Sequence, residues 1–239
     1  MRRRDFLVAC ACAACAGGAR ANGLVEPHMR FDAPRGTPQV ALTLDACMGE
    51  TDERLLGPLI DNAIRTTLFV TKRWLDGNGP AVALIARHRD LFSVENHGAM
   101  HVPAVIGTER PYGIAPAGTT EAVRDEVLGG SDAIVRAFGT APRWYRDATA
   151  LYSLDAIALI EELGFRVAGF SLNGDFGASA SAETAHQNIA ESRSGDVVIA
   201  HINQPHRAAG AGVISGILAL KARGHQFVHL DDLAMKSVA

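Results

Sequence analysis

The sequence predicts an α/β fold in which a parallel sheet or barrel forms one domain. Two observations support this prediction. Strand-like and helix-like segments alternate about seven times along the chain, and such alternation is typical of parallel sheets covered by helices. Several strand-like segments are almost entirely apolar, which indicates strands buried on both faces.

The expected elements follow from periodicity and from residues that end helices. Strands are predicted at 40–44, 67–70, 91–95, 143–145, 166–171, 196–201 and 226–230. Helices are predicted at 52–62, 81–88, 120–138, 154–163, 182–192 and 213–222. Glycines follow most of these helices within a few residues, as is common where a helix ends. No repeat or linker divides the chain.

Composition restricts the class of protein. The chain has 239 residues, 48% of them hydrophobic and 21% charged, which is enough to bury a sizeable core. Its formal net charge is only -3, and no basic run could neutralise phosphates, so we expect no nucleic-acid partner. Of the 4 cysteines, only Cys47 lies beyond residue 21. No internal disulfide is therefore expected in the folded domain.

Residues 1–21 are expected to be an export signal, and residues 22–239 the folded domain. The segment has a basic start, a short apolar stretch and the small-residue ending ARA. Its RRDFL sequence at residues 3–7 resembles the twin-arginine signal, with an ordinary secretory signal or a lipoprotein anchor as alternatives. The apolar stretch is too short to span a bilayer. We expect a periplasmic or extracellular protein without a membrane span.

Polar residues lie at the carboxyl ends of five predicted strands, where α/β folds gather their catalytic groups. These residues are Asp45, Asn96, His97, His101, Arg146, Asp147, Asn173, Asp175 and His201. Their convergence indicates a catalytic site.

Each residue taken alone has a simpler explanation. The pair of histidines four residues apart could be incidental in a chain with 9 histidines. Asp45 could cap the helix that follows it. Arg146 could be a surface charge, and His201 a hydrogen-bonded histidine of the core. Together, at successive strand ends, these explanations are less satisfactory than one shared site.

On these residues the chain resembles the polysaccharide deacetylases that share the NodB homology domain (carbohydrate esterase family 4). The resemblance covers residues 40–230. Five family motifs are met in order by Thr43-Leu44-Asp45-Ala46, by His97 and His101, by Arg146, by residues 170–175 and by residues 197–201. The third motif is met only at its arginine, because Asp147-Ala148-Thr149-Ala150 follows where the family has P-P-x-G. The resemblance implies a distorted barrel of about seven parallel strands.

The resemblance also implies roles for these residues. A divalent metal, usually zinc, would be bound by His97 and His101 together with a carboxylate. Asp45 would be the general base and His201 the general acid, with Arg146 orienting the base. Asp175, the aspartate of the fourth motif, is expected among the catalytic residues.

The first motif departs from the family at one position. Ala46 stands where the family has its metal-binding aspartate. We expect Asp45 to contact the metal directly, with Cys47, Glu50 and Asp175 as alternative ligands. A thiolate suits zinc, but Cys47 is expected to point away from the Ala46 face or to pack as a small hydrophobic residue.

The expected function is therefore removal of acyl groups from an N- or O-acetylated carbohydrate of the cell envelope. An amidohydrolase that cleaves another C–N bond is one alternative. A carbohydrate-binding pseudoenzyme is another, suggested by Ala46. The Gly- and Pro-rich loop at residues 103–119 could shape a substrate groove, with Tyr112 as a wall, or could be a plain ordered loop.

Overall fold

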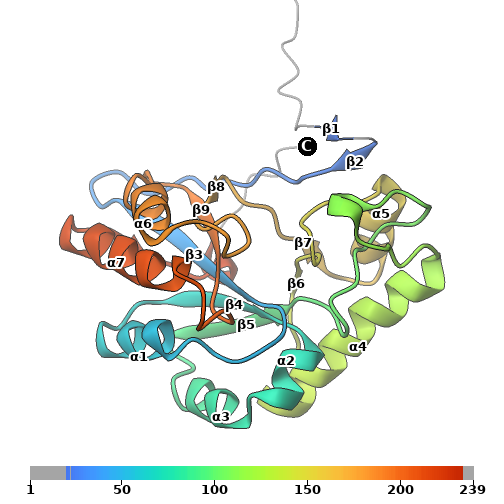
Figure 1. Cartoon of the computed structure of the whole chain (residues 1–239), viewed down its shortest axis with the longest axis horizontal. Helices are drawn as coiled ribbons and strands as arrows, with labels where there is room; N and C mark the ends of the chain where they lie inside the picture. Colours follow the sequence, from blue (N-terminus) through green and yellow to red (C-terminus); the bar gives the residue numbers. More distant parts are fainter. Residues whose placement is uncertain (1–19, 22, 234–239) are drawn as a thin grey trace, which may run out of the picture.

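A parallel sheet forms the centre of the computed structural model, which describes residues 20–21 and 23–233 (Figure 1). Seven strands follow one another in the order β7-β6-β5-β4-β3-β9-β8, and β10 pairs with the start of β3. The strands are β3 (Gln39–Ala46), β4 (Thr66–Val70), β5 (Phe92–Asn96), β6 (Trp144–Tyr145), β7 (Arg166–Val167), β8 (Leu172–Asn173), β9 (Val197–His201) and β10 (Gln226–Phe227). A separate antiparallel pair, β1 (Arg20–Ala21) and β2 (Leu24–Val25), precedes them.

The central strand β3 aligns the carboxyl ends of its neighbours. It pairs with β4 on one side and β9 on the other, and Asp45 lies in register with both Phe69 and His201. Every residue of β3 after Gln39 is buried, which explains its nearly continuous apolar sequence. The polar residues at these strand ends therefore meet at one rim of the sheet.

The sheet curls into a half-barrel whose two edges are linked by one segment of chain. The sequence predicted a single strand at 166–171, and this prediction is wrong. The segment divides into β7, which pairs with β6 at one edge, and β8, which pairs with β9 at the other. Gly169 lies in the connection against the backbone of Pro27, where an added Cβ would overlap the Pro27 carbonyl. Close approach of the two backbones thus requires glycine here.

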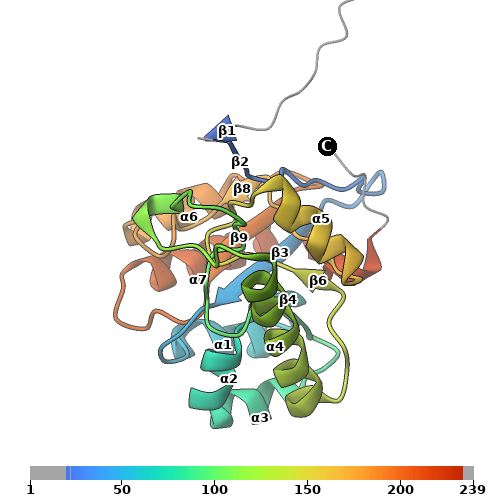
Figure 2. The ribbon, with the colours of Figure 1, turned by 90° about the vertical axis from the view of Figure 1, so that its right-hand side faces the viewer.

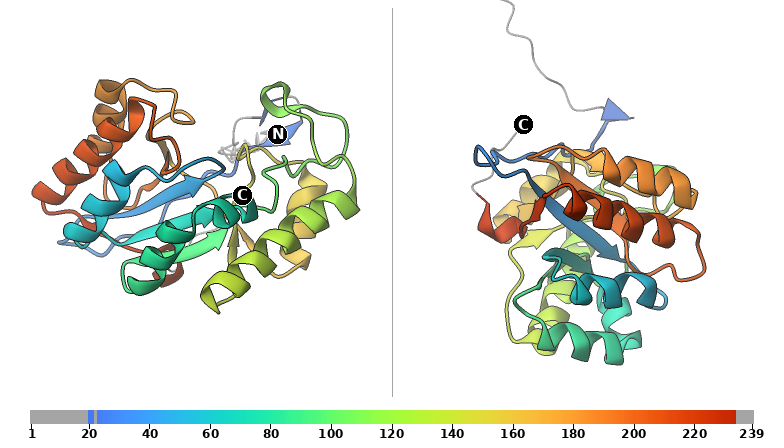
Figure 3. Two further views of the ribbon diagram at one scale, coloured as in Figure 1. Left: turned by 60° about the horizontal axis from the view of Figure 1, so that its bottom comes forward. Right: turned by 90° about the vertical axis from the view of Figure 1, so that its left-hand side faces the viewer.

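Helices surround the sheet. Figures 1 and 3 show α1, α6 and α7 together on one side and α4 and α5 on the opposite side, and Figure 2 shows α4 and α5 from the front. The helices are α1 (Glu53–Asp61), α2 (Lys72–Gly77), α3 (Gly79–Arg87), α4 (Thr120–Phe138), α5 (Leu154–Glu162), α6 (Ala182–Ala190) and α7 (Ala209–Ala222), with 3-10 turns η1 (Pro111–Gly113) and η2 (Leu230–Asp232). Within residues 23–233, each helix is too short or too polar to cross a bilayer.

Local sequence explains where most helices begin. The side chains of Asp52, Thr71, Thr119, Ser153 and Ser181 accept hydrogen bonds from amides in the first turns of α1, α2, α4, α5 and α6. Asp52 thus caps the helix after β3, so the alternative that Asp45 caps it is wrong.

Two apolar clusters lie on opposite faces of the sheet. The larger one includes Leu42, Leu44 and Ala46 of β3 and packs against the surrounding helices. The smaller one includes Ala41 and Phe69 and lies on the other face. Because side chains alternate along a strand, Asp45 shares the face of Ala41 and continues it toward the carboxyl end. We call this face, which carries Ala41, Phe69 and Asp45, the inner face of the half-barrel. It is apolar at its base and polar at the rim.

Candidate active site

Asp45 and Arg146 form a buried ion pair at the rim. Nη1 of Arg146 donates to Oδ1 of Asp45 at 2.8 Å and to Oγ1 of Thr43 at 2.8 Å. Its Nη2 donates to the carbonyl of Gly169, and the guanidinium lies 4.2 Å from the centre of the Phe69 ring. Arg146 is fully buried, so the alternative of a surface charge is wrong. Five donors on a planar group allow it to fix the carboxylate and both neighbouring elements together.

This environment keeps Asp45 ionised. Burial alone would raise the pKa of Asp45, but the charge of Arg146, helped by His97 and His201, lowers it below its ordinary value. One carboxylate oxygen is held by the arginine. The other, Oδ2, lies 3.9 Å from Nε2 of His97. Asp45 thus presents an unprotonated oxygen to the centre of the site.

His201 and Asp175 form a second pair, in which the carboxylate supports the positive charge of the histidine. The backbone N–H of His201 donates to Oδ2 of Asp175 at 2.8 Å, and its ring Nδ1 lies 3.0 Å from Oδ1. Burial would lower the pKa of His201, but the Asp175 carboxylate, followed by Cys47, holds it well above the ordinary value. The carboxylate accepts a hydrogen bond from Nδ1–H, which leaves Nε2 as the nitrogen that can donate a proton elsewhere.

Cys47, His97 and His101 bring three possible metal ligands together. Their ligand atoms all lie within 4.8 Å of one another, and Sγ of Cys47 is 3.5 Å from Nε2 of His97. Nε2 of His101 is buried and has no hydrogen-bond partner among the described residues. Burial would raise the pKa of the Cys47 thiol, but His97 and His201 lower it well below its ordinary value. A low thiol pKa favours the thiolate, which is the form that binds metals. These residues fit a zinc-type centre.

The loop after β5 holds His101 in an uncommon conformation. His101 has φ 65, in the left-handed region that non-glycine residues rarely adopt. Glu126 of α4 fixes the residues on both sides, because its carboxylate accepts from the amides of Met100 and Val102. Gly98 has φ 90, and a Cβ there would overlap Glu126. Strain of this kind persists where the surrounding structure enforces it, often at functional sites.

Glu126 was not predicted from the sequence. It is only 5% exposed, on the buried face of α4 beside Val123 and Val127. The sequence signal for it was a glutamate on the apolar face of a predicted helix. Such a carboxylate is buried and needs hydrogen-bond partners, which indicates a structural or functional role.

Asp147 organises the loop that follows Arg146. Its carboxylate accepts from the amide of Ala104 and from the amide and hydroxyl of Thr149, and its own amide donates to the hydroxyl of Tyr152. Ala150 has φ 55 at the turn. These hydrogen bonds restrict the backbone of the loop, as the fixed φ of proline does in other loops.

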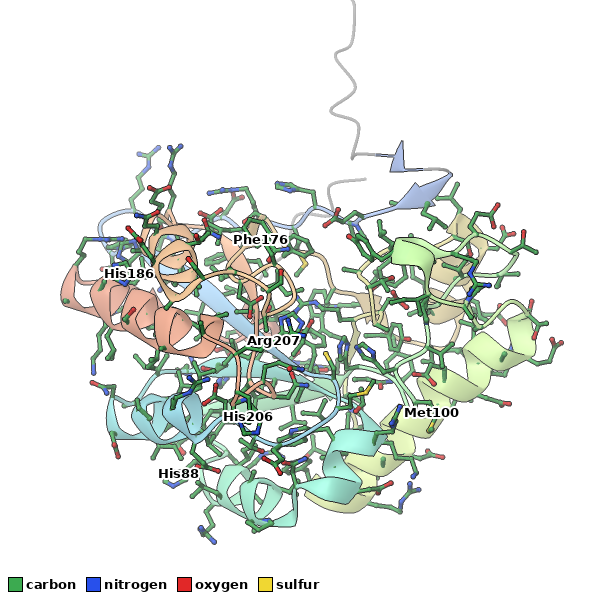
Figure 4. The ribbon with its side chains drawn as sticks, in the orientation of Figure 1. His88, Met100, Phe176, His186, His206 and Arg207 are labelled. Carbon is green, nitrogen blue, oxygen red and sulfur yellow. The ribbon has the colours of Figure 1, made fainter. Side chains whose placement is uncertain are left out.

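Two other predicted residues, Glu50 and Tyr112, are exposed and do not belong to the converging group. The Glu50 side chain is 81% exposed, and its carboxylate lies 3.9 Å from His206. Tyr112 is 76% exposed in η1, and its role as a groove wall stays a prediction. Figure 4 shows His206 and Arg207 near the middle of the view, with Phe176 above them and Met100 to their right. Met100 and Phe176 are 50% and 53% exposed, on loops that follow β5 and β8.

The chain is similar to known proteins in sequence and in fold. The sequence model of the family described as Polysaccharide deacetylase matches residues 32–168. A search of curated proteins found no significant match. A CE4 family pseudoenzyme from Bacillus anthracis is 16% identical, with 86% of this chain and 67% of that chain covered and a TM-score of 0.68.

Two further solved structures have similar folds. A family 4 acetyl xylan esterase from Clostridium thermocellum, in complex with a cobalt ion, is 22% identical over 81% of this chain and 89% of that chain, with a TM-score of 0.64. A peptidoglycan N-acetylglucosamine deacetylase is 21% identical over 85% of this chain and 91% of that chain, with a TM-score of 0.67. The family match extends over more than half of the sequence, and the chain belongs to the polysaccharide deacetylase family.

Proposed function

We propose that the protein is a metal-dependent hydrolase that removes acetyl groups from an N- or O-acetylated carbohydrate of the cell envelope. One observation carries the proposal. A carboxylate held ionised by Arg146 and a histidine held protonated by Asp175 flank the group of Cys47, His97 and His101. Acyl transfer to water needs a base and an acid on either side of a polarised carbonyl.

The base is Asp45. Its Oδ2 is not used by Arg146 and can accept a proton from the attacking water. A metal bound at the neighbouring ligands would supply Lewis-acid polarisation of the acetyl carbonyl and a more acidic water. Arg146 fixes the carboxylate in one orientation, so little reorganisation is needed when the proton moves.

The acid is His201. Its ring is held by Asp175 through Nδ1, so Nε2 can give a proton to the departing amine or hydroxyl of the sugar. Because the Asp175 carboxylate raises the pKa of His201, the imidazolium form persists near neutral pH. After transfer, the same pair can recover the proton from water.

The substrate class is supported by the fold neighbours and by the loops around the site. The neighbours include a family 4 acetyl xylan esterase and a peptidoglycan N-acetylglucosamine deacetylase. Exposed Met100 and Phe176 could pack against the apolar faces of sugar rings.

We also propose export of the protein. The signal that would direct it lies in residues 1–21, of which residues 1–19 are outside the described part. Export should stop in the Arg3→Lys, Arg4→Lys double variant, and unchanged export would favour an ordinary secretory signal.

Acetate release tests the proposed hydrolysis. The zinc-loaded full chain is incubated with N-acetylglucosamine oligomers and, separately, with acetylated xylan. We expect acetate from at least one of them, and a loss of ~10²–10⁴-fold in His201→Gln. His186→Gln is the matched control, because His186 is a half-buried histidine on α6 whose Nδ1 bonds to Ser215. Absence of acetate from both substrates, or undiminished release by His201→Gln, would contradict the proposal.

Carbohydrate binding without hydrolysis is a second candidate. Ala46 favours it, because the family's metal-binding aspartate is missing there. In that case calorimetry would detect binding of the same oligomers, while zinc-loaded protein released no acetate.

A further inference from the structure

The strand geometry places Cys47 in the site and Ala46 outside it. Ala46 is fully buried within the apolar cluster that faces the helices. Asp45 and Cys47, one residue on either side, both contact His97 on the inner face. Alternation of side chains along the strand explains this division. The carboxylate missing at Ala46 is therefore matched by a sulfur at Cys47.

The spacing of the ligand atoms suits one shared metal ion. Zinc binds sulfur at about 2.3 Å and nitrogen at about 2.0–2.1 Å, so two such ligands in a tetrahedral site lie roughly 3.6 Å apart. Sγ of Cys47 and Nε2 of His97 are 3.5 Å apart. The same distance is ordinary for a hydrogen bond to sulfur, so it is the convergence of all three ligand atoms within 4.8 Å of one another that indicates a metal.

Each of the two histidines has a ring nitrogen that can bind a metal. Nδ1 of His97 lies 2.8 Å from the backbone carbonyl of Arg146 and donates to it, so Nε2, which faces Cys47, is the ring nitrogen available to a metal. Nε2 of His101 is buried without a hydrogen-bond partner in the described part of the chain. A buried nitrogen of this kind is costly unless something binds it.

Asp45 has other partners. Its Oδ1 accepts from Arg146, and it is not one of the three residues whose ligand atoms converge within 4.8 Å. We propose that Cys47 is the third protein ligand of the metal, so that a thiolate takes the place of the family's carboxylate and Asp45 serves only as the base.

A thiolate ligand changes which metals the site prefers. Soft sulfur ligands favour zinc and cadmium, whereas carboxylates suit magnesium and manganese. The centre should therefore bind Zn²⁺ and Cd²⁺ and discriminate strongly against Mn²⁺ and Mg²⁺. This inference rests on the proposed function only in assuming that the site binds a metal. The ligands of that metal can be measured without measuring catalysis.

X-ray absorption at the zinc edge tests the inference. The full chain carries Cys10, Cys12 and Cys15, so all three are changed to serine in the reference protein, which keeps Cys47. We expect one sulfur neighbour per zinc at about 2.3 Å and none after the further change Cys47→Ser. Zinc affinity should fall in Cys47→Ser by more than the ~10–100-fold that changes around a metal's ligands usually cost.

Two aspartate variants separate the neighbouring positions. Cys47→Asp should restore most zinc binding and shift metal preference toward manganese, because a carboxylate then stands on the inner face. Ala46→Asp should not substitute for the thiolate in a Cys47→Ser background, and should lower the melting temperature, because it puts a carboxylate into the apolar cluster.

Several outcomes would overturn the inference. Zinc bound only by nitrogen and oxygen in the reference protein would exclude Cys47 as a ligand, without affecting the hydrolase proposal if acetate is still released. Conversely, one sulfur neighbour with no acetate release would support the metal centre and contradict the proposed function. Acetate release that resists chelators but is lost in Cys47→Ser would identify Cys47 as a nucleophile instead.

Discussion

Arg146 and Asp45 form a buried ion pair in which the arginine holds one carboxylate oxygen at 2.8 Å and leaves the other facing His97. The pair joins β3 to the end of β6, and through the Gly169 carbonyl it also reaches the segment that links the two edges of the sheet. One side chain therefore supports both the charge of Asp45 and the closure of the half-barrel.

Replacing Arg146 should affect stability as well as catalysis. Arg146→Gln leaves the Asp45 carboxylate buried without its cation, which typically costs about 3–5 kcal/mol. We expect urea unfolding to show a loss of that order, together with a large fall in acetate release. The control is Arg143→Gln, whose guanidinium is 61% exposed and pairs with Asp231. Surface pairs contribute about 0–1 kcal/mol, so equal losses in the two variants would contradict the assigned role.

Removing the charge of Asp175 should move the pH profile. The carboxylate raises the pKa of His201 against the effect of burial, so Asp175→Asn should lower that pKa. A general acid with a lower pKa loses its proton at lower pH, so the alkaline limb of kcat against pH should shift downward. The exposed Asp132→Asn on α4 is the control. An unchanged alkaline limb in Asp175→Asn would mean that His201 is not the acid.

Glu126 is expected to act as a positioning residue for His101. In Glu126→Gln, one of the two carboxylate oxygens that bind the loop amides is replaced by an NH₂ group, which cannot accept from them. We expect zinc affinity to fall by roughly 10–100-fold, as for other changes that disturb the orientation of metal ligands. Chelator competition measures this. The exposed Glu121→Gln on the same helix should leave affinity unchanged. A lower melting temperature with unaltered zinc affinity would show a purely structural role.

Much of the fold could be predicted because its central strands are covered on both faces. The predicted strand 40–44 differs from β3 by one residue at its start and two at its end, and the predicted strand 67–70 differs from β4 by one residue at its start. The segment 166–171 could not be divided correctly from its sequence. Its apolar residues pair at two different edges of the sheet, and this depends on curvature and on contact with Pro27 rather than on local propensity.

The site was predictable in part for a similar reason. Strand ends on a parallel sheet meet at one rim, so the convergence of Asp45, Arg146 and His201 followed from their places in the sequence. The sequence predicted Asp45 as the third ligand, whereas in the structure the ligand atom of Cys47 lies with those of His97 and His101. Alternation along β3 predicts that Cys47 shares the face of Asp45, but the hydrogen bonds of Asp45 to Arg146 come from tertiary structure.

The most direct test of the account measures acetate release and zinc content on the same samples of wild type and Asp45→Asn. If Asp45 is the base and Cys47 completes the metal centre, Asp45→Asn should keep its zinc while turnover falls by ~10²–10⁴-fold, the contribution usual for a general base. Loss of zinc together with activity would show that Asp45 is itself a metal ligand, and undiminished acetate release would show that Asp45 is not the base.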